Sequence, residues 1–191
     1  MRRRNCRECI LKREIQNIPD LTALVMLFYS EPSRLGSFEA ADPAEMSAYF
    51  RELLDHHNHM TVTVEHYHHT PVDVDVLETR LDDGHYARKI LLRRQTDHAV
   101  VQFGIMRLDF SCVSPEVRQV VESQSAPLGR VLIEHNVLRE VRLVNIWKVT
   151  LGPDLAGYFG VDEGQTTFGR TARIDFDGRP AVELLEIVTV P

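Results

Sequence analysis

The sequence has few of the features that mark several large classes of protein. It has three cysteines, and no apolar run approaches the roughly 18 residues that a membrane-spanning helix needs. It has no excess of positive charge either, since 22 Lys and Arg stand against 28 Asp and Glu. Nothing in the bulk field would attract phosphate, so we expect neither a nucleic-acid nor a membrane partner.

Cysteine is too scarce for a disulfide framework, because Cys6, Cys9 and Cys112 would leave one thiol over. Cys6 and Cys9 have the spacing of half a zinc site, but no second pair follows to complete four ligands. Residues 1–15 begin like the basic region of a signal peptide, but charges interrupt the segment behind it. We therefore expect a cytoplasmic protein with mostly reduced thiols.

The composition and periodicity that are present fit one domain, which we place at residues 1–191. Hydrophobic residues make up 43% and charged residues 26% of the chain. Two-residue alternation predicts strands over 59–68, 72–81, 86–95, 99–110, 138–151, 169–177 and 180–190. Capping residues and helical spacing predict helices over 19–29, 42–57 and 114–124. Asp20 and Ser114 would be N-caps, and Asp177-Gly178 would turn between the last two strands. This order indicates an α+β fold with an antiparallel sheet.

Three charged side chains lie on strand faces that are otherwise apolar. Glu186 shares its face with Leu184, because side chains two residues apart point the same way. Arg88 follows the same pattern, and Arg107 is a weaker case that could reach water at a strand end. Burial of an unpaired charge is costly, so Arg88 and Glu186 would either pair with each other or meet a bound ligand. In the second case the planar fork of Arg88 would engage a carboxylate.

Several short motifs stand in a familiar order. They are His59-Met60-Thr61, Arg88–Leu92, Pro127-Leu128-Gly129, Gly169–Arg173, and Gly178-Arg179-Pro180 followed by Glu186. Together they resemble the chorismate pyruvate-lyase (4-hydroxybenzoate synthase)-like superfamily, of which this chain would be a divergent member. The resemblance runs from about residue 50 to residue 191, and residues 1–50 would form an N-terminal helical extension.

The resemblance implies an antiparallel sheet of about six strands, with helices inserted in its connections, around an internal ligand pocket. It also implies a carbon–oxygen lyase that eliminates pyruvate from chorismate, or from a related enolpyruvyl acid, to give a hydroxybenzoate. No metal or other cofactor takes part in that reaction. The protein would position a small anionic cyclohexadiene or aromatic ligand and stabilise charge on the departing oxygen.

Carried over to this sequence, the resemblance assigns the catalytic roles to Arg88, which would grip a substrate carboxylate, and to Glu186, which would bond the ring hydroxyl. The resemblance further assigns substrate contacts to Met60, Leu128 and Gly129.

The family type also has a second arginine, in an Ala-Gly-Arg segment. This sequence reads Phe103-Gly104-Ile105 there, so Arg107 could replace that arginine only with a shift in register. With one cation fewer, a dianionic substrate would be held less well.

Two other functions stay open beside the lyase. A similar fold serves as the effector-sensing domain of some transcription regulators, so the chain could bind an aromatic acid without catalysis. It could also be a metal-dependent enzyme that uses the histidines at positions 56–69. On a strand, His66 and His68 would share one face as a ligand pair, with His57 or His59 as a third ligand.

Overall fold

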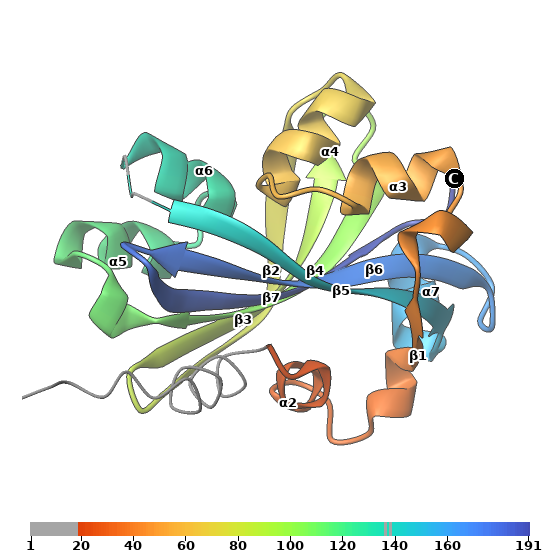
Figure 1. Cartoon of the computed structure of the whole chain (residues 1–191), viewed down its shortest axis with the longest axis horizontal. Coiled ribbons are helices and arrows are strands. Elements are labelled where there is room, and N and C mark those ends of the chain that lie inside the picture. The colour runs from red at the N-terminus through yellow and green to blue at the C-terminus, as the bar shows by residue number, and fades with distance from the viewer. Residues whose placement is uncertain (1–18, 136, 138) are drawn as a thin grey trace, which may run out of the picture.

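In the part of the chain that the structure describes, seven strands form one antiparallel sheet, in the order β1-β5-β6-β7-β4-β3-β2. The computed structural model describes residues 19–135, 137 and 139–191, and Figure 1 shows how they are arranged. The strands are β1 (Gly36–Ala41), β2 (Val72–Asp82), β3 (His85–Arg94), β4 (Val100–Asp109), β5 (Arg139–Leu151), β6 (Thr166–Phe176) and β7 (Arg179–Val188). The α+β class and the antiparallel sheet are confirmed.

Helices are inserted in the connections between the strands (Figure 1). They are α2 (Leu21–Met26), α3 (Ala48–Leu54), α4 (Met60–His68), α5 (Pro115–Glu122), α6 (Leu128–Glu134) and α7 (Pro153–Phe159), with 3-10 turns at Pro32–Arg34, Pro43–Glu45 and Phe110–Cys112. The caps are confirmed: Asp20 accepts from the N–H of Thr22 at 2.9 Å, and Ser114 from that of Val117 at 3.3 Å. None of the helices in the described ranges is long and apolar enough to cross a membrane.

The prediction of a strand over 59–68 is wrong, because most of this segment is helix α4. Alternating Thr and Val are typical of a strand, but burial here follows helical spacing. Met60 and Val64 are buried in the core, whereas Val62 is 46% exposed. The packing of Met60 and Val64 therefore overrides the weak helix propensity of the β-branched residues around them.

Residues 36–41 form a strand that the sequence did not indicate. This strand, β1, pairs with the end of β5. The sheet therefore has seven strands, as many as the sequence predicted, although the strand predicted over 59–68 is a helix. Gly36 is required at its start, because a Cβ there would lie 2.2 Å from the carbonyl oxygen of Thr150. Cys6 and Cys9 lie outside the described residues, and the organisation as a single domain with an extension over residues 1–50 stays a prediction.

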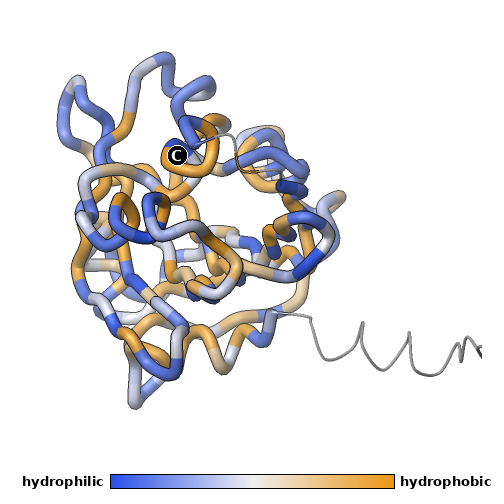
Figure 2. The backbone as a smooth tube through the Cα atoms, turned by 90° about the vertical axis from the view of Figure 1, so that its left-hand side faces the viewer, coloured by the Kyte–Doolittle hydropathy of each residue, from blue (hydrophilic) through white to orange (hydrophobic). Residues whose placement is uncertain are grey.

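The sheet buries apolar side chains on both faces, and on one face they form two separate clusters. Helices α2 and α7 cover the opposite face, where Leu24 packs with Phe103. On the divided face, one cluster gathers under α5 and α6 and includes Leu132, and the other gathers under α3 and α4 and includes Leu53. Figure 2 shows hydrophobic residues gathered where segments pack together and hydrophilic ones on the outer turns. The candidate site lies where these two clusters meet.

Candidate functional site

A cavity of about 50 Å³ lies on the divided face of the sheet, lined by residues of both clusters. Its floor includes Arg88 of β3, Gly104 of β4 and Glu186 of β7, and helices α4 and α6 contribute Met60 and Leu128. One buried water needs at least roughly 10–15 Å³. The cavity therefore accepts a ligand of only a few non-hydrogen atoms unless the helices above it move.

Glycine makes the hollow in the floor. Ile90, Gly104, Glu186 and Arg170 lie opposite one another across the neighbouring strands β3, β4, β7 and β6. Three of these residues have long side chains, and Gly104 has none. A Cβ added at Gly104 would lie 3.2 Å from Cγ1 of Ile90, so even a methyl group would begin to fill the space.

Arg88 is a buried cation without an anionic partner. It is only 1% exposed, its Nη1 and Nη2 both lie 3.5 Å from the carbonyl oxygen of Ala126, and its Nε has no partner among the described residues. Among the residues that the structure describes, no carboxylate lies within ion-pair distance of it. Burial lowers the pKa of Arg88 from its usual value, because the charged form is desolvated.

Glu186 pairs with Arg170 and not with Arg88. Nε of Arg170 donates to Oε2 of Glu186 at 2.7 Å, and the arginine is fully buried. The direct pair of Arg88 with Glu186, one of two readings of the strand pattern, does not form. Sequence reasoning did not assign Arg170 to the site, although the same face carries the apolar Ala172 and Ile174. The alternation test that selected Arg88 would have selected Arg170 as well.

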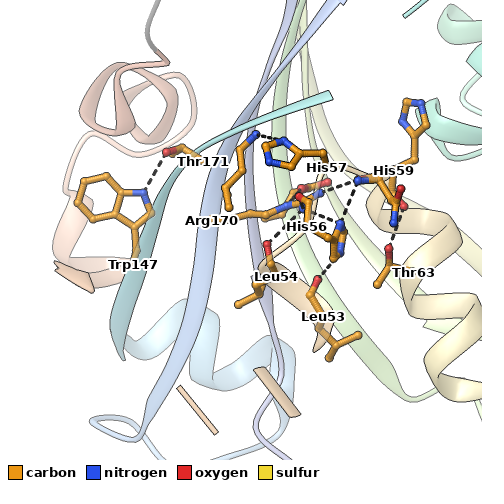
Figure 3. A network of polar contacts seen from close by, with 12 residues as sticks. Leu53, Leu54, His56, His57, His59, Thr63, Trp147, Arg170 and Thr171 are labelled. Carbon is orange, nitrogen blue, oxygen red and sulfur yellow. Dashed lines mark hydrogen bonds and ion pairs between the residues drawn. The ribbon is translucent and has the colours of Figure 1, made fainter. Parts of the chain in front are cut away.

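Arg170 also holds the loop between α3 and α4 (Figure 3). Its Nη1 donates to the carbonyl oxygens of His56 at 3.0 Å and Leu54 at 3.4 Å, and its Nη2 to that of Asn58 at 3.2 Å. The ring of His56 lies between the same groups, with Nε2 2.8 Å from the carbonyl oxygen of Leu53. Burial, and then the charge of Arg170, lower the pKa of His56 to about 4, so the ring is neutral at pH 7.

His59 separates the cavity from an open groove on the surface. Both spaces are lined by His59 and Val141, and the groove is also lined by Arg139. Nε of Arg139 donates to Nε2 of His59 at 2.6 Å, while its Nη1 donates to the carbonyl oxygen of Val137 at 2.7 Å. Burial, and then the charge of Arg139, lower the pKa of His59 to about 4. His59 is therefore a neutral acceptor at pH 7.

The structure brings most of the predicted site residues together. Those that line the cavity are Arg88, Glu186, Met60, Leu128 and Gly129. Arg107 does not line the cavity. Met106, the preceding residue, does line it, and consecutive side chains on a strand point to opposite faces of the sheet. On the other face, Nε of Arg107 donates to Oε2 of Glu183 at 2.6 Å. The sheet thus pairs Arg107 with Glu183, without the shift in register that would turn it toward the cavity.

The histidines at positions 56–69 do not form a metal site. Within the described ranges, no group of three or more His, Cys, Asp or Glu side chains could hold a metal ion. The pairing of His66 with His68 depended on a strand, and residues two apart on helix α4 do not share a face. His57 lies 3.3 Å from the carbonyl oxygen of Val141, and His59 accepts from Arg139.

No protein-family model and no curated protein sequence matches the chain. Among solved structures it is similar to the effector domain of PhnF from Mycobacterium smegmatis, with a TM-score of 0.54 and 10% identity over 69% of this chain and 88% of that one. PhnF itself matches with a TM-score of 0.53 and 10% identity over 69% and 64%. A possible transcriptional regulator, YydK, from Bacillus subtilis matches with a TM-score of 0.47 and 12% identity over 62% and 58%. This chain thus spans less than two thirds of the latter two chains.

These similarities correct the prediction of a pyruvate-eliminating lyase. The match with the highest TM-score given above is an effector domain, and none of the structures named above is described as a lyase. One fold can carry unrelated functions, because function depends on the residues of the site. Here the expected second arginine is missing and the carboxylate of Glu186 is already bound by Arg170. The chain has the chorismate lyase-like α+β fold, which the effector domain of PhnF shares.

Proposed function

We propose that this domain binds a small anionic ligand in its internal cavity and acts as an effector-sensing module without catalysis. The observation that carries the proposal is Arg88, a buried guanidinium that lines the cavity and has no carboxylate of the described residues within ion-pair distance. Arginine keeps its proton inside proteins, so this charge cannot be avoided by deprotonation. A bound anion would compensate it.

Energetics supports this use of Arg88. Burying an ion costs several kcal/mol unless an opposite charge or good hydrogen bonds compensate. The two contacts with Ala126 are at the limit of hydrogen-bond distance and give little compensation. Arg170, two strands beyond β4 in the same sheet, is the contrasting case, since Glu186 and three backbone carbonyls satisfy it. Of these two buried arginines, Arg88 is the one left to bind a ligand.

A sensing role is supported by the fold. PhnF from Mycobacterium smegmatis has an effector domain with this architecture. A sensing domain needs a ligand pocket and a cover that responds to the ligand, and the cavity lies directly under helices α4 and α6. We propose that its signal passes to a DNA-binding segment or partner outside the described residues.

Thermal denaturation with simple anions tests the proposal. Sodium acetate, sodium phosphate and sodium benzoate are compared at equal ionic strength, with sodium chloride as the reference. We expect at least one of the three to raise the melting temperature of the wild type, since a ligand at 100 times its Kd adds about 2.7 kcal/mol. That corresponds to a rise of about 5–10 °C for a domain of this size.

Two matched variants complete this experiment. Arg88→Met should lose the response, whereas Arg107→Met should respond like the wild type, because Arg107 lies on the other face and pairs with Glu183. Absence of any response in the wild type, or an equal response in Arg88→Met, would overturn the proposal.

A further inference from the structure

A second polar side chain in the cavity also lacks a partner. Gln102 of β4 is only 2% exposed and lines the same space as Arg88. Its Oε1 is buried and accepts no hydrogen bond from any residue that the structure describes. A buried amide oxygen without a donor is uncommon in folded proteins, because losing its bonds to water costs about 1–3 kcal/mol.

The amide of Gln102 lies beside the open floor. A Cβ added at Gly104 would be 3.6 Å from Nε2 of Gln102, so the amide group borders the hollow that the glycine leaves. In the sheet Gln102 lies opposite Leu92 and Val188, which belong to the cluster under α3 and α4. Arg88 lies opposite Met106, which belongs to the other cluster. The cavity thus has a cationic end and an amide end.

These two ends set the chemistry of the ligand. Taking the proposed anion binding as its basis, we infer that the ligand is a small acid that also carries a hydroxyl group, with the anion at Arg88 and the hydroxyl at Gln102. A hydroxyl both donates and accepts. It therefore satisfies the amide whichever way its oxygen and nitrogen are oriented.

The size of the cavity narrows the class further. Along β4, Gln102 and Met106 are four residues apart, or about 13–14 Å between backbone positions. Two long side chains reach into this length from Gln102 and Arg88, and the free volume between them is about 50 Å³. A short aliphatic hydroxy acid fits this space without rearrangement, whereas a hydroxybenzoate fits only if the cover opens.

Matched pairs of acids test the inference. Binding of glycolate and acetate, of 3-hydroxypropanoate and propanoate, and of 4-hydroxybenzoate and benzoate is measured by calorimetry. We expect at least one hydroxy acid to bind the wild type 10-fold or more tightly than its partner without the hydroxyl. In Gln102→Met, this preference should shrink to less than 3-fold while the acid without the hydroxyl binds as before.

The outcomes separate this inference from the proposed function. Gln95→Met is the control, because Gln95 lies on the surface and bonds to Asp73, and it should keep the preference. Equal binding within every pair by the wild type, or an unchanged preference in Gln102→Met, would overturn the hydroxyl assignment alone. If no acid binds in a way that depends on Arg88, the proposed function itself is wrong. The thermal midpoint of Gln102→Met, expected to equal or exceed that of the wild type, shows that the variant is folded.

Discussion

Replacing Arg88 with methionine should make the ligand-free protein more stable. Methionine has a similar length and no charge, so it removes the buried cation while largely keeping the packing around Met106 and Leu128. The sign of the change in stability tells the two roles apart. If Arg88 serves only to bind a ligand, its replacement stabilises the ligand-free protein. If Arg88 held the fold together, its loss would destabilise the protein.

The expected gain in the free energy of unfolding follows from the contacts that Arg88 makes. The variant gives up two contacts of 3.5 Å to Ala126, which are worth little at that distance. It no longer bears the desolvation penalty of a charge that is 1% exposed. Replacing buried ionic groups by apolar ones of similar volume is often neutral or stabilises proteins by about 1–4 kcal/mol. We expect about 2 kcal/mol, or a rise of about 4–8 °C in melting temperature.

The assay is urea denaturation in a buffer without small organic acids, with Arg170→Met as the matched control. That control removes the partner of Glu186 and the donor to three backbone carbonyls, so it should destabilise the protein by about 3–5 kcal/mol. A loss of more than about 1 kcal/mol in Arg88→Met would refute the reasoning. Arg88 would then be part of the structural framework.

Three further predictions concern the surroundings of the site. Gly104→Ala should weaken acid binding by calorimetry while shifting the free energy of unfolding by less than about 1 kcal/mol, because the new methyl group enters the cavity and comes no closer than 3.2 Å to Ile90 and 3.6 Å to Gln102. An unchanged affinity would place the ligand elsewhere. The pKa of His59 is about 4 in the folded protein and near 6.5 when unfolded, so stability should fall as the pH drops from 6.5 to 4. Urea midpoints across this range should change less in His59→Gln, which can still accept from Arg139, and an identical slope would contradict the assignment. Asp20→Ala should cost about 1 kcal/mol in urea denaturation through loss of the helix cap, unlike Asp20→Asn, which retains an accepting oxygen.

The strands and turns that local chemistry dictates were predictable from the sequence. The turn at Asp177-Gly178 has positive φ at both residues, 48° and 75°, as a two-residue hairpin requires. Helix α4 was not predictable in this way, because the alternation of Thr61–Val64 equally fits a strand, and only the packing decides. Strand β1 was not predicted, because Gly36–Ala41 is only six residues long and its place depends on β5, more than a hundred residues away.

The site was predictable as far as it depends on alternation along a strand. Arg88 and Glu186 stood out because their neighbours two residues away are apolar, and both line the cavity. Their partners were not predictable, since pairing depends on which strands are adjacent and in what register. Gln102 carries no charge and gave no signal until its burial was known.

The bonds from Arg170 to the α3–α4 loop have a consequence for motion. Segments at the surface commonly open on their own, well below the free energy of global unfolding. The carbonyls of this loop are instead held by a guanidinium anchored on β6, whose Nε is bound to the floor of the cavity. The loop cannot lift away without breaking contacts inside the core. In native-state hydrogen exchange, the loop and the adjacent strands should therefore open together as one cooperative unit.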